Sequence, residues 1–181
     1  MKARPRSRMA TRTGLLLFVV LFTVSSVWAA EPQARQSVAK SADGEFLDYG
    51  DGTIYNTKTG LMWMKQDFWQ MNRQWVNWYT AVEFVRRMNN KKFGGYTDWR
   101  LPTPAEAGTL YDPRKRNLDK DGDKIHIDPL FPAGSGWSTW TSEEKKSKAV
   151  VVSYKGEGGK EYQDKIEGTD AFLRLVRGPM S

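Results

Sequence analysis

The segment 94–106, with the sequence GGYTDWRLPTPAE, constrains the fold more than any other part of the chain. Its two leading glycines allow backbone angles that other residues avoid, which favours a tight turn. Pro102 pushes the residue before it into an extended conformation. Thr103, Pro104 and Glu106 then have the spacing of an N-cap, a first helical residue and a capping-box partner. The segment therefore predicts a turn, a short extended stretch and a helix start.

The remaining periodicity predicts few helices and several short strands. A helix is expected over 75–89, because apolar residues recur there at three- and four-residue spacing. A shorter helix is expected over 104–111. Short apolar runs between glycine-rich and charged turns indicate strands. These lie at 46–49, 53–55, 61–64, 137–141, 149–154 and 171–176. Strands, then two helices, then strands make an α+β fold class.

The N-terminus has the pattern of a secretory signal peptide over residues 1–29. Five basic residues precede the apolar run 14–24, and small residues allow cleavage after Ala29, or less favourably after Ala30. An uncleaved anchor is the alternative, but the apolar run is short for a membrane span. We expect a flexible polar leader at 30–44 and one domain at 45–181. Export places the domain in the periplasm or outside the cell, without a stable membrane span after cleavage.

Cleavage also changes the charge of the chain. Five of the 28 basic residues lie in the signal segment and no acidic residue does, so the mature chain carries 23 basic against 21 acidic residues. An anion site must therefore come from local clustering rather than bulk charge. With export, this argues against a nucleic-acid partner. The chain has no cysteine, which excludes disulfides, thiol nucleophiles and cysteine-ligated metals.

Several segments resemble the Lcl C-terminal domain family, named after a collagen-like bacterial adhesin and formerly a domain of unknown function. The resemblance implies a C-type-lectin-like fold, with two helices and short antiparallel strands whose N- and C-terminal members pair. The family's best-known member binds sulfated glycosaminoglycans, which implies adhesion through an anionic or sulfated polysaccharide. The matching landmarks, in order, are TGLMW at 59–63, the helix at 75–88, GYTDWRLPTPAE at 95–106, IDPLFP at 127–132, WTS at 140–142 and LRLVRG at 173–178.

A polar insertion at 117–128, NLDKDGDKIHID, has the spacing of a calcium loop. Oxygen ligands at alternate positions, a glycine at the sixth and a carboxylate at the twelfth are typical of an EF-hand. The match has faults, since no long helices flank the loop and its first and last ligands are atypical. A solvated Asp/Gly-rich turn is the alternative. The expected calcium ligands are Asn117, Asp119, Asp121, Asp123 and Asp128.

Two basic segments are the expected contacts for an anionic glycan. Arginine forks and lysine ammonium groups both suit sulfate and phosphate. The alternative is that these charges form ordinary solvated faces, since acidic residues are interleaved with them. The residues are Arg114, Lys115 and Arg116 in one segment and Lys145, Lys146 and Lys148 in the other.

The aromatic residues divide between core and surface. Core packing is expected for Trp63, Trp75, Trp78 and Trp99, which occupy helical or strand-like positions. Two further tryptophans at 137 and 140 lie three apart, so on a strand they point to opposite faces. The family landmark makes Trp140 the core residue, which leaves Trp137 as a flat ring for stacking on a sugar.

Asp98 and Arg100 flank Trp99 in the segment 94–106, which we call the family signature, and they are expected to be structural. Their side chains either pair with each other, or Arg100 caps backbone carbonyls below the glycine turn.

No enzyme motif is present. The only histidine, His126, lies in a polar turn, and the sequence has no nucleophile elbow, HExxH, phosphate loop or dinucleotide fingerprint. We therefore expect an exported, non-catalytic binding module, although the many carboxylates leave a two-aspartate hydrolase open. The alternatives are a periplasmic protein-interaction module, including self-association, and a structural domain stabilised by calcium.

Overall fold

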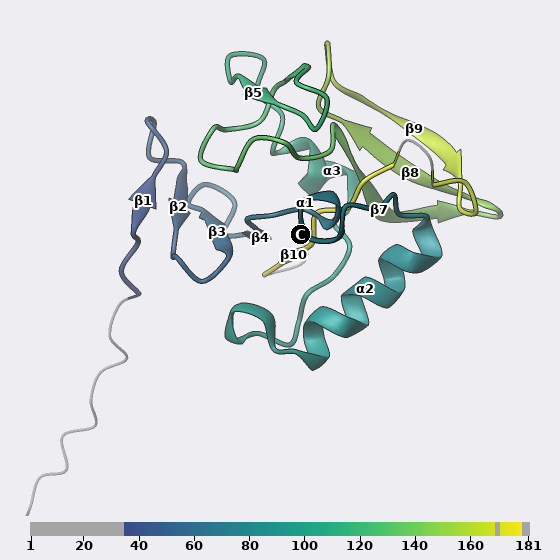
Figure 1. The fold of residues 1–181 in the computed structure, drawn as a ribbon, viewed down its shortest axis with the longest axis horizontal. Coiled ribbons are helices and arrows are strands. Elements are labelled where there is room, and N and C mark those ends of the chain that lie inside the picture. Colours follow the sequence, from purple (N-terminus) through teal and green to yellow (C-terminus); the bar gives the residue numbers. More distant parts are fainter. Residues whose placement is uncertain (1–34, 169–170, 179–181) are drawn as a thin grey trace, which may run out of the picture. The chain divides into compact units, whose positions relative to one another are not determined.

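A computed structural model describes residues 35–168 and 171–178. The predicted signal peptide at 1–29 and the start of the leader lie outside these residues. The described chain is α+β, as predicted, with antiparallel sheets and the helices α1 (Phe68–Asn72), α2 (Trp78–Asn90) and α3 (Pro104–Gly108), plus a 3-10 turn, η1 (Phe93–Gly95). Figure 1 shows the longest helix, α2, at one side of the three-stranded sheet β7–β8–β9.

The first sheet has five antiparallel strands in the order β1–β2–β3–β4–β10. The last strand pairs with β4, placing Val176 opposite Trp63. The C-terminal strand therefore joins the N-terminal sheet, with β4 as its partner, at the edge opposite to β1. The strands are β1 (Ala39–Lys40), β2 (Phe46–Asp48), β3 (Thr53–Asn56), β4 (Met62–Met64) and β10 (Val176–Arg177).

Strand β1 corrects the expected leader at 30–44. Its two residues pair with β2, and Ser41 just beyond it is buried. The Ser41 hydroxyl accepts a hydrogen bond from the Phe46 N–H at 2.9 Å and donates to Asp43. The ordered domain therefore begins before Glu45, because this polar segment satisfies its hydrogen bonds at the edge of the sheet.

The second sheet carries three strands in the order β7 (Ser138–Lys145), β8 (Lys148–Ser153) and β9 (Gly159–Asp164). The strand β9 was not predicted, because its sequence GKEYQD is polar and exposed. A small two-stranded ribbon, β5 (Asn117–Leu118) and β6 (Lys124–Ile125), holds the Asp-rich insertion.

Caps decide where the helices begin and end. The capping box of Thr103 and Glu106 is present as predicted. Helix α3 ends at Gly108 rather than at residue 111, because the next three N–H groups donate to carbonyls three residues back, as in a 3-10 turn, instead of four. Asn77 caps α2 by accepting from the Thr80 N–H, so the helix starts at Trp78 rather than at residue 75. Helix α1 was missed, although it has its own capping box.

The core confirms three of the predicted tryptophans. Trp63, Trp99 and Trp140 are almost fully buried, and Trp78 is half-buried. Trp75 was wrongly predicted to be core: it precedes the N-cap of α2 and is 37% exposed.

The segment 171–175 was predicted to be a strand but is not one. Its backbone is buried and bonds to three separate parts of the chain. The Phe172 carbonyl accepts from Trp140, the Leu173 carbonyl from Phe68 and the Leu175 carbonyl from Met64. This segment therefore crosses the core as buried chain without regular secondary structure.

The signature residues act structurally, but not as a pair. Asp98 binds Arg177, whereas Arg100 makes a bidentate bond to Glu106, with both distances 2.7 Å. At the start of the signature Gly94 adopts a φ of 61°, which confirms the expected turn.

Candidate binding cleft

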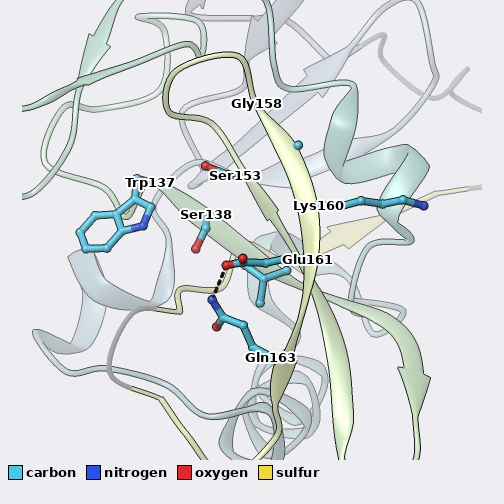
Figure 2. Close-up of a pocket in the computed structure, with 9 residues that line it drawn as sticks. Trp137, Ser138, Ser153, Gly158, Lys160, Glu161 and Gln163 are labelled. Atoms are coloured by element: carbon cyan, nitrogen blue, oxygen red, sulfur yellow. Dashed lines mark hydrogen bonds between the residues drawn. The ribbon is translucent and has the colours of Figure 1, made fainter.

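A cleft of about 500 Å³ lies on one face of the β7–β8–β9 sheet. The strand register explains its composition, because Ser138 lies opposite Ser153, and Val151 lies opposite Glu161. Residues paired across antiparallel strands share a face, so these side chains project together. Figure 2 shows Trp137 at one side of the cleft and Lys160 pointing away from it. The lining residues are Trp137, Ser138, Val151, Ser153, Gly158, Gly159, Lys160, Glu161 and Gln163.

The cleft offers polar groups of several kinds. Glu161 accepts a hydrogen bond from the Gln163 amide at 2.8 Å (Figure 2). The Ser138 side chain is buried, and its hydroxyl has no hydrogen-bond partner within the described part of the chain. A buried hydroxyl without a partner is costly, so a ligand gains free energy where a small opening of the cleft lets it bond to this oxygen. The cleft thus presents hydroxyl, carboxylate and amide groups beside an indole ring.

Trp137 forms the aromatic wall. Its ring centroid lies 4.7 Å from that of Phe172 and 6.0 Å from that of Trp75, which fixes its orientation. The Lys155 ammonium lies 4.4 Å from the same ring centroid. Sequence reasoning chose this residue as a surface platform, and the structure places it, half-buried, in the wall of a cleft.

The Asp-rich loop lies beside this wall, and two lysines pair with its carboxylates. The Lys155 ammonium lies 2.8 Å from carboxylate oxygens of both Asp119 and Asp123, and Lys120 lies 2.8 Å from Asp121. Burial alone would raise the pKa of Asp119, but Lys155 and two backbone N–H groups outweigh it and hold that pKa below its ordinary value.

The other two predicted calcium ligands point elsewhere. The Asn117 amide donates to the carbonyls of Asp128 and Phe131, and its oxygen accepts from the Leu118 N–H. The Asp128 carboxylate binds Lys115 at 2.5 Å. Across residues 35–168 and 171–178, no three acidic or histidine side chains gather as a metal site. Calcium binding stays a prediction of the sequence, and it would require the ion to displace lysine ammonium groups.

The two basic segments differ from each other. Lys115 is held between Asp43 and Asp128, and these carboxylates hold its pKa above the ordinary value against the opposing effect of burial. Arg114 is exposed but binds Asp112, and this bond lowers the pKa of the aspartate to about 2. Arg116 is exposed. Only part of this segment is therefore available to a ligand.

The second basic segment is more open. Lys145, Lys146 and Lys148 are all exposed at the turn between β7 and β8. Figure 1 shows this turn and the ribbon strand β5, which follows the first basic segment, at different sides of the domain. The structure does not bring the two segments together, so they do not form one site.

The structure defines an α+β domain with a cleft that combines an aromatic wall with polar groups. The Lcl C-terminal domain family matches residues 52–177, well over half of the chain, so the chain belongs to this family. This membership suggests a domain associated with the cell envelope. No curated protein and no solved structure matches the chain significantly. Within the described ranges, the helices are too short or too polar to cross a membrane.

Proposed function

We propose that this protein is an exported, non-catalytic binding module that recognises a glycan at the cell envelope through the cleft on the β7–β8–β9 sheet. The observation that carries the proposal is the Trp137 ring standing beside a row of serine, glutamate and glutamine side chains on one sheet face. The proposal includes the C-type-lectin-like fold expected from the family resemblance, and the pairing of β10 with β4 supports it.

The chemistry of the cleft suits a sugar. A sugar ring has an apolar C–H face, which packs on a flat aromatic ring, and a rim of hydroxyl groups. Glu161 accepts hydrogen bonds, whereas the Gln163 amide and the Ser138 hydroxyl both donate and accept them. Sites that bind small ligands typically combine apolar walls with a few such convergent polar groups. This cleft has that combination.

The non-catalytic part of the proposal has its own support. His126 lies outside the cleft, with its ring against Tyr111 and its Nδ1 3.1 Å from the Lys115 carbonyl. Glu161 is the one carboxylate among the residues that line the cleft. A glycosidase of the usual kind needs two carboxylates across the scissile bond.

A sulfated or otherwise anionic glycan is the second candidate, and the turn between β7 and β8 favours it. Three exposed lysines lie within four residues there, while the neighbouring Glu144 binds Lys165 and Glu143 accepts from Tyr162. Lysine ammonium groups at an exposed turn attract sulfate, and this attraction weakens as salt screens it.

One experiment separates the two candidates. The purified protein is titrated with a hexamer of N-acetylglucosamine, dextran and heparin at low and high salt. Trp137→Ala removes the aromatic wall. Tyr162→Ala is its matched control, because Tyr162 is an exposed aromatic on β9 that does not line the cleft. A third variant replaces Lys145, Lys146 and Lys148 with glutamate.

The cleft proposal expects salt-resistant binding of an uncharged glycan that Trp137→Ala abolishes and Tyr162→Ala leaves intact. Binding of heparin alone, lost in the lysine variant and at high salt, would instead establish the anionic candidate. If none of the three polysaccharides binds at low salt, the glycan proposal fails and a protein partner becomes the better hypothesis.

A further inference from the structure

Three indole rings beside the cleft enclose an ammonium group. The Lys120 Nζ lies 5.0 Å from the ring centroid of Trp69, 4.8 Å from that of Trp75 and 5.5 Å from that of Trp137. All three distances are within reach of a cation–π interaction. The ring planes of Trp69 and Trp75 are inclined by 55°, and those of Trp75 and Trp137 by 73°. We call these three tryptophans the aromatic cage.

The cage opens to solvent even though its cation is well covered. The Lys120 side chain is 12% exposed, whereas Trp75 is 37% exposed and Asp121, which holds the same ammonium, is exposed as well. Lys120 is tethered through its backbone N–H to the Ser135 carbonyl. Because its carboxylate partner lies at the surface, the Lys120 ammonium can leave the cage and keep its ion pair.

The charges around the cage favour a cation. Three carboxylates, those of Asp119, Asp121 and Asp123, face two ammonium groups, those of Lys120 and Lys155. One negative charge therefore remains uncompensated in this cluster. The cation–π surface of three indoles and this excess charge act in the same direction, and both disfavour a sulfate at this end of the cleft.

We propose that the aromatic cage binds the ammonium group of a cationic sugar, a glucosamine residue within a deacetylated glycan, and that Lys120 occupies this position in the free protein. The inference rests on the proposed function, because Trp137 belongs to both the cage and the cleft. A glycan chain lying in the cleft can thus place an amino group among the three indoles. Lys120 competes for the cage, so it limits binding to ligands that carry their own cation.

The first test compares two sugars of equal length. Hexamers of glucosamine and of N-acetylglucosamine are titrated calorimetrically at a pH below the pKa of the sugar amine. We expect the glucosamine hexamer to bind about tenfold more tightly, as a partly desolvated cation–π contact implies. Trp75→Ala should remove this preference, so that the two hexamers bind this variant with equal affinity, even if the loss of the ring contact with Trp137 weakens both. Equal affinity for the two hexamers would overturn the cage proposal and leave the proposed function standing.

A second test does not depend on a glycan. Tetramethylammonium chloride is titrated against tryptophan fluorescence, with sodium chloride as the ionic-strength control. Saturable quenching is expected in the natural protein, and Lys120→Ala, checked for an unchanged melting profile, should bind severalfold more tightly. If tetramethylammonium binds in this way but neither hexamer binds, the cage is a cation site and the proposed glycan ligand is wrong. No saturable quenching in the natural protein would overturn the cage, whatever the variant does.

Discussion

The bidentate pair of Arg100 and Glu106 gives a sharp prediction about the family signature. Glu106 is 4% exposed, and its carboxylate meets the Arg100 guanidinium at two distances of 2.7 Å. The same carboxylate accepts the Thr103 N–H at 2.8 Å in the capping box of α3. We predict that Glu106→Ala destabilises the protein strongly and leaves ligand binding by the folded fraction unchanged.

The magnitude follows from the contacts that are lost. Removal of the capping box costs about 1 kcal/mol of unfolding free energy. Loss of a charged, largely buried hydrogen-bonded pair costs about 2 kcal/mol more, since Arg100 keeps some contact with solvent. The sum of about 3 kcal/mol corresponds to a fall in melting temperature of roughly 10 °C for a domain of this size. Glu106→Gln keeps the shape and part of the bonding, so its loss should be smaller.

Urea unfolding followed by tryptophan fluorescence measures this loss, because Trp63, Trp99 and Trp140 are buried and report on the core. A loss below about 1 kcal/mol for Glu106→Ala would refute the structural role of the pair. The same holds if the variant keeps its stability but loses ligand binding, because the signature would then belong to a functional site.

Two further predictions concern stability. Gly136→Ala should prevent folding or lower the free energy of unfolding by more than about 3 kcal/mol, because an added Cβ would lie 1.8 Å from the Phe172 ring. Gly108→Ala, with open space around it, should be neutral or stabilising. Thermal melts of the two variants test both expectations. Lys155→Met should lower stability by roughly 1–3 kcal/mol at pH 7, because it leaves the buried Asp119 unpaired. The pKa of Asp119 is lowered in the folded state, so this contribution is present above its unfolded pKa of about 4 and is lost as pH falls below it. A difference between natural protein and variant that grows on acidification would contradict this.

Features that depend on a few neighbouring residues, such as helix caps and tight turns, could be predicted from the sequence. The capping residues of α3 and the glycine turn at 94–95 were predicted from the sequence and are present. The capping box of α1, formed by Asp67 and Gln70, was also visible in the sequence, but so short a helix has no apolar period. The strand β9 is a polar edge strand, and nothing in its own sequence distinguishes it from a loop.

The candidate cleft was harder to predict because its residues come from separate strands. Trp137 was identified, but Glu161 and Gln163 join it only through the register of β8 with β9. The role of Lys120 was hidden in the same way, because its three indole partners come from other segments. The clustering of basic residues in the sequence predicted that Lys115 binds a ligand, whereas in the structure Lys115 forms ion pairs with Asp43 and Asp128.

The central claim is that the face of the β7–β8–β9 sheet binds a glycan, and amide chemical-shift mapping tests it most directly. The isotope-labelled protein is titrated with the N-acetylglucosamine hexamer. We predict that the largest saturable shifts fall on Ser138, Glu161 and Gln163 and on the indole N–H of Trp137. Shifts confined to the lysine turn at 145–148, or no shifts at saturating hexamer, would contradict the claim.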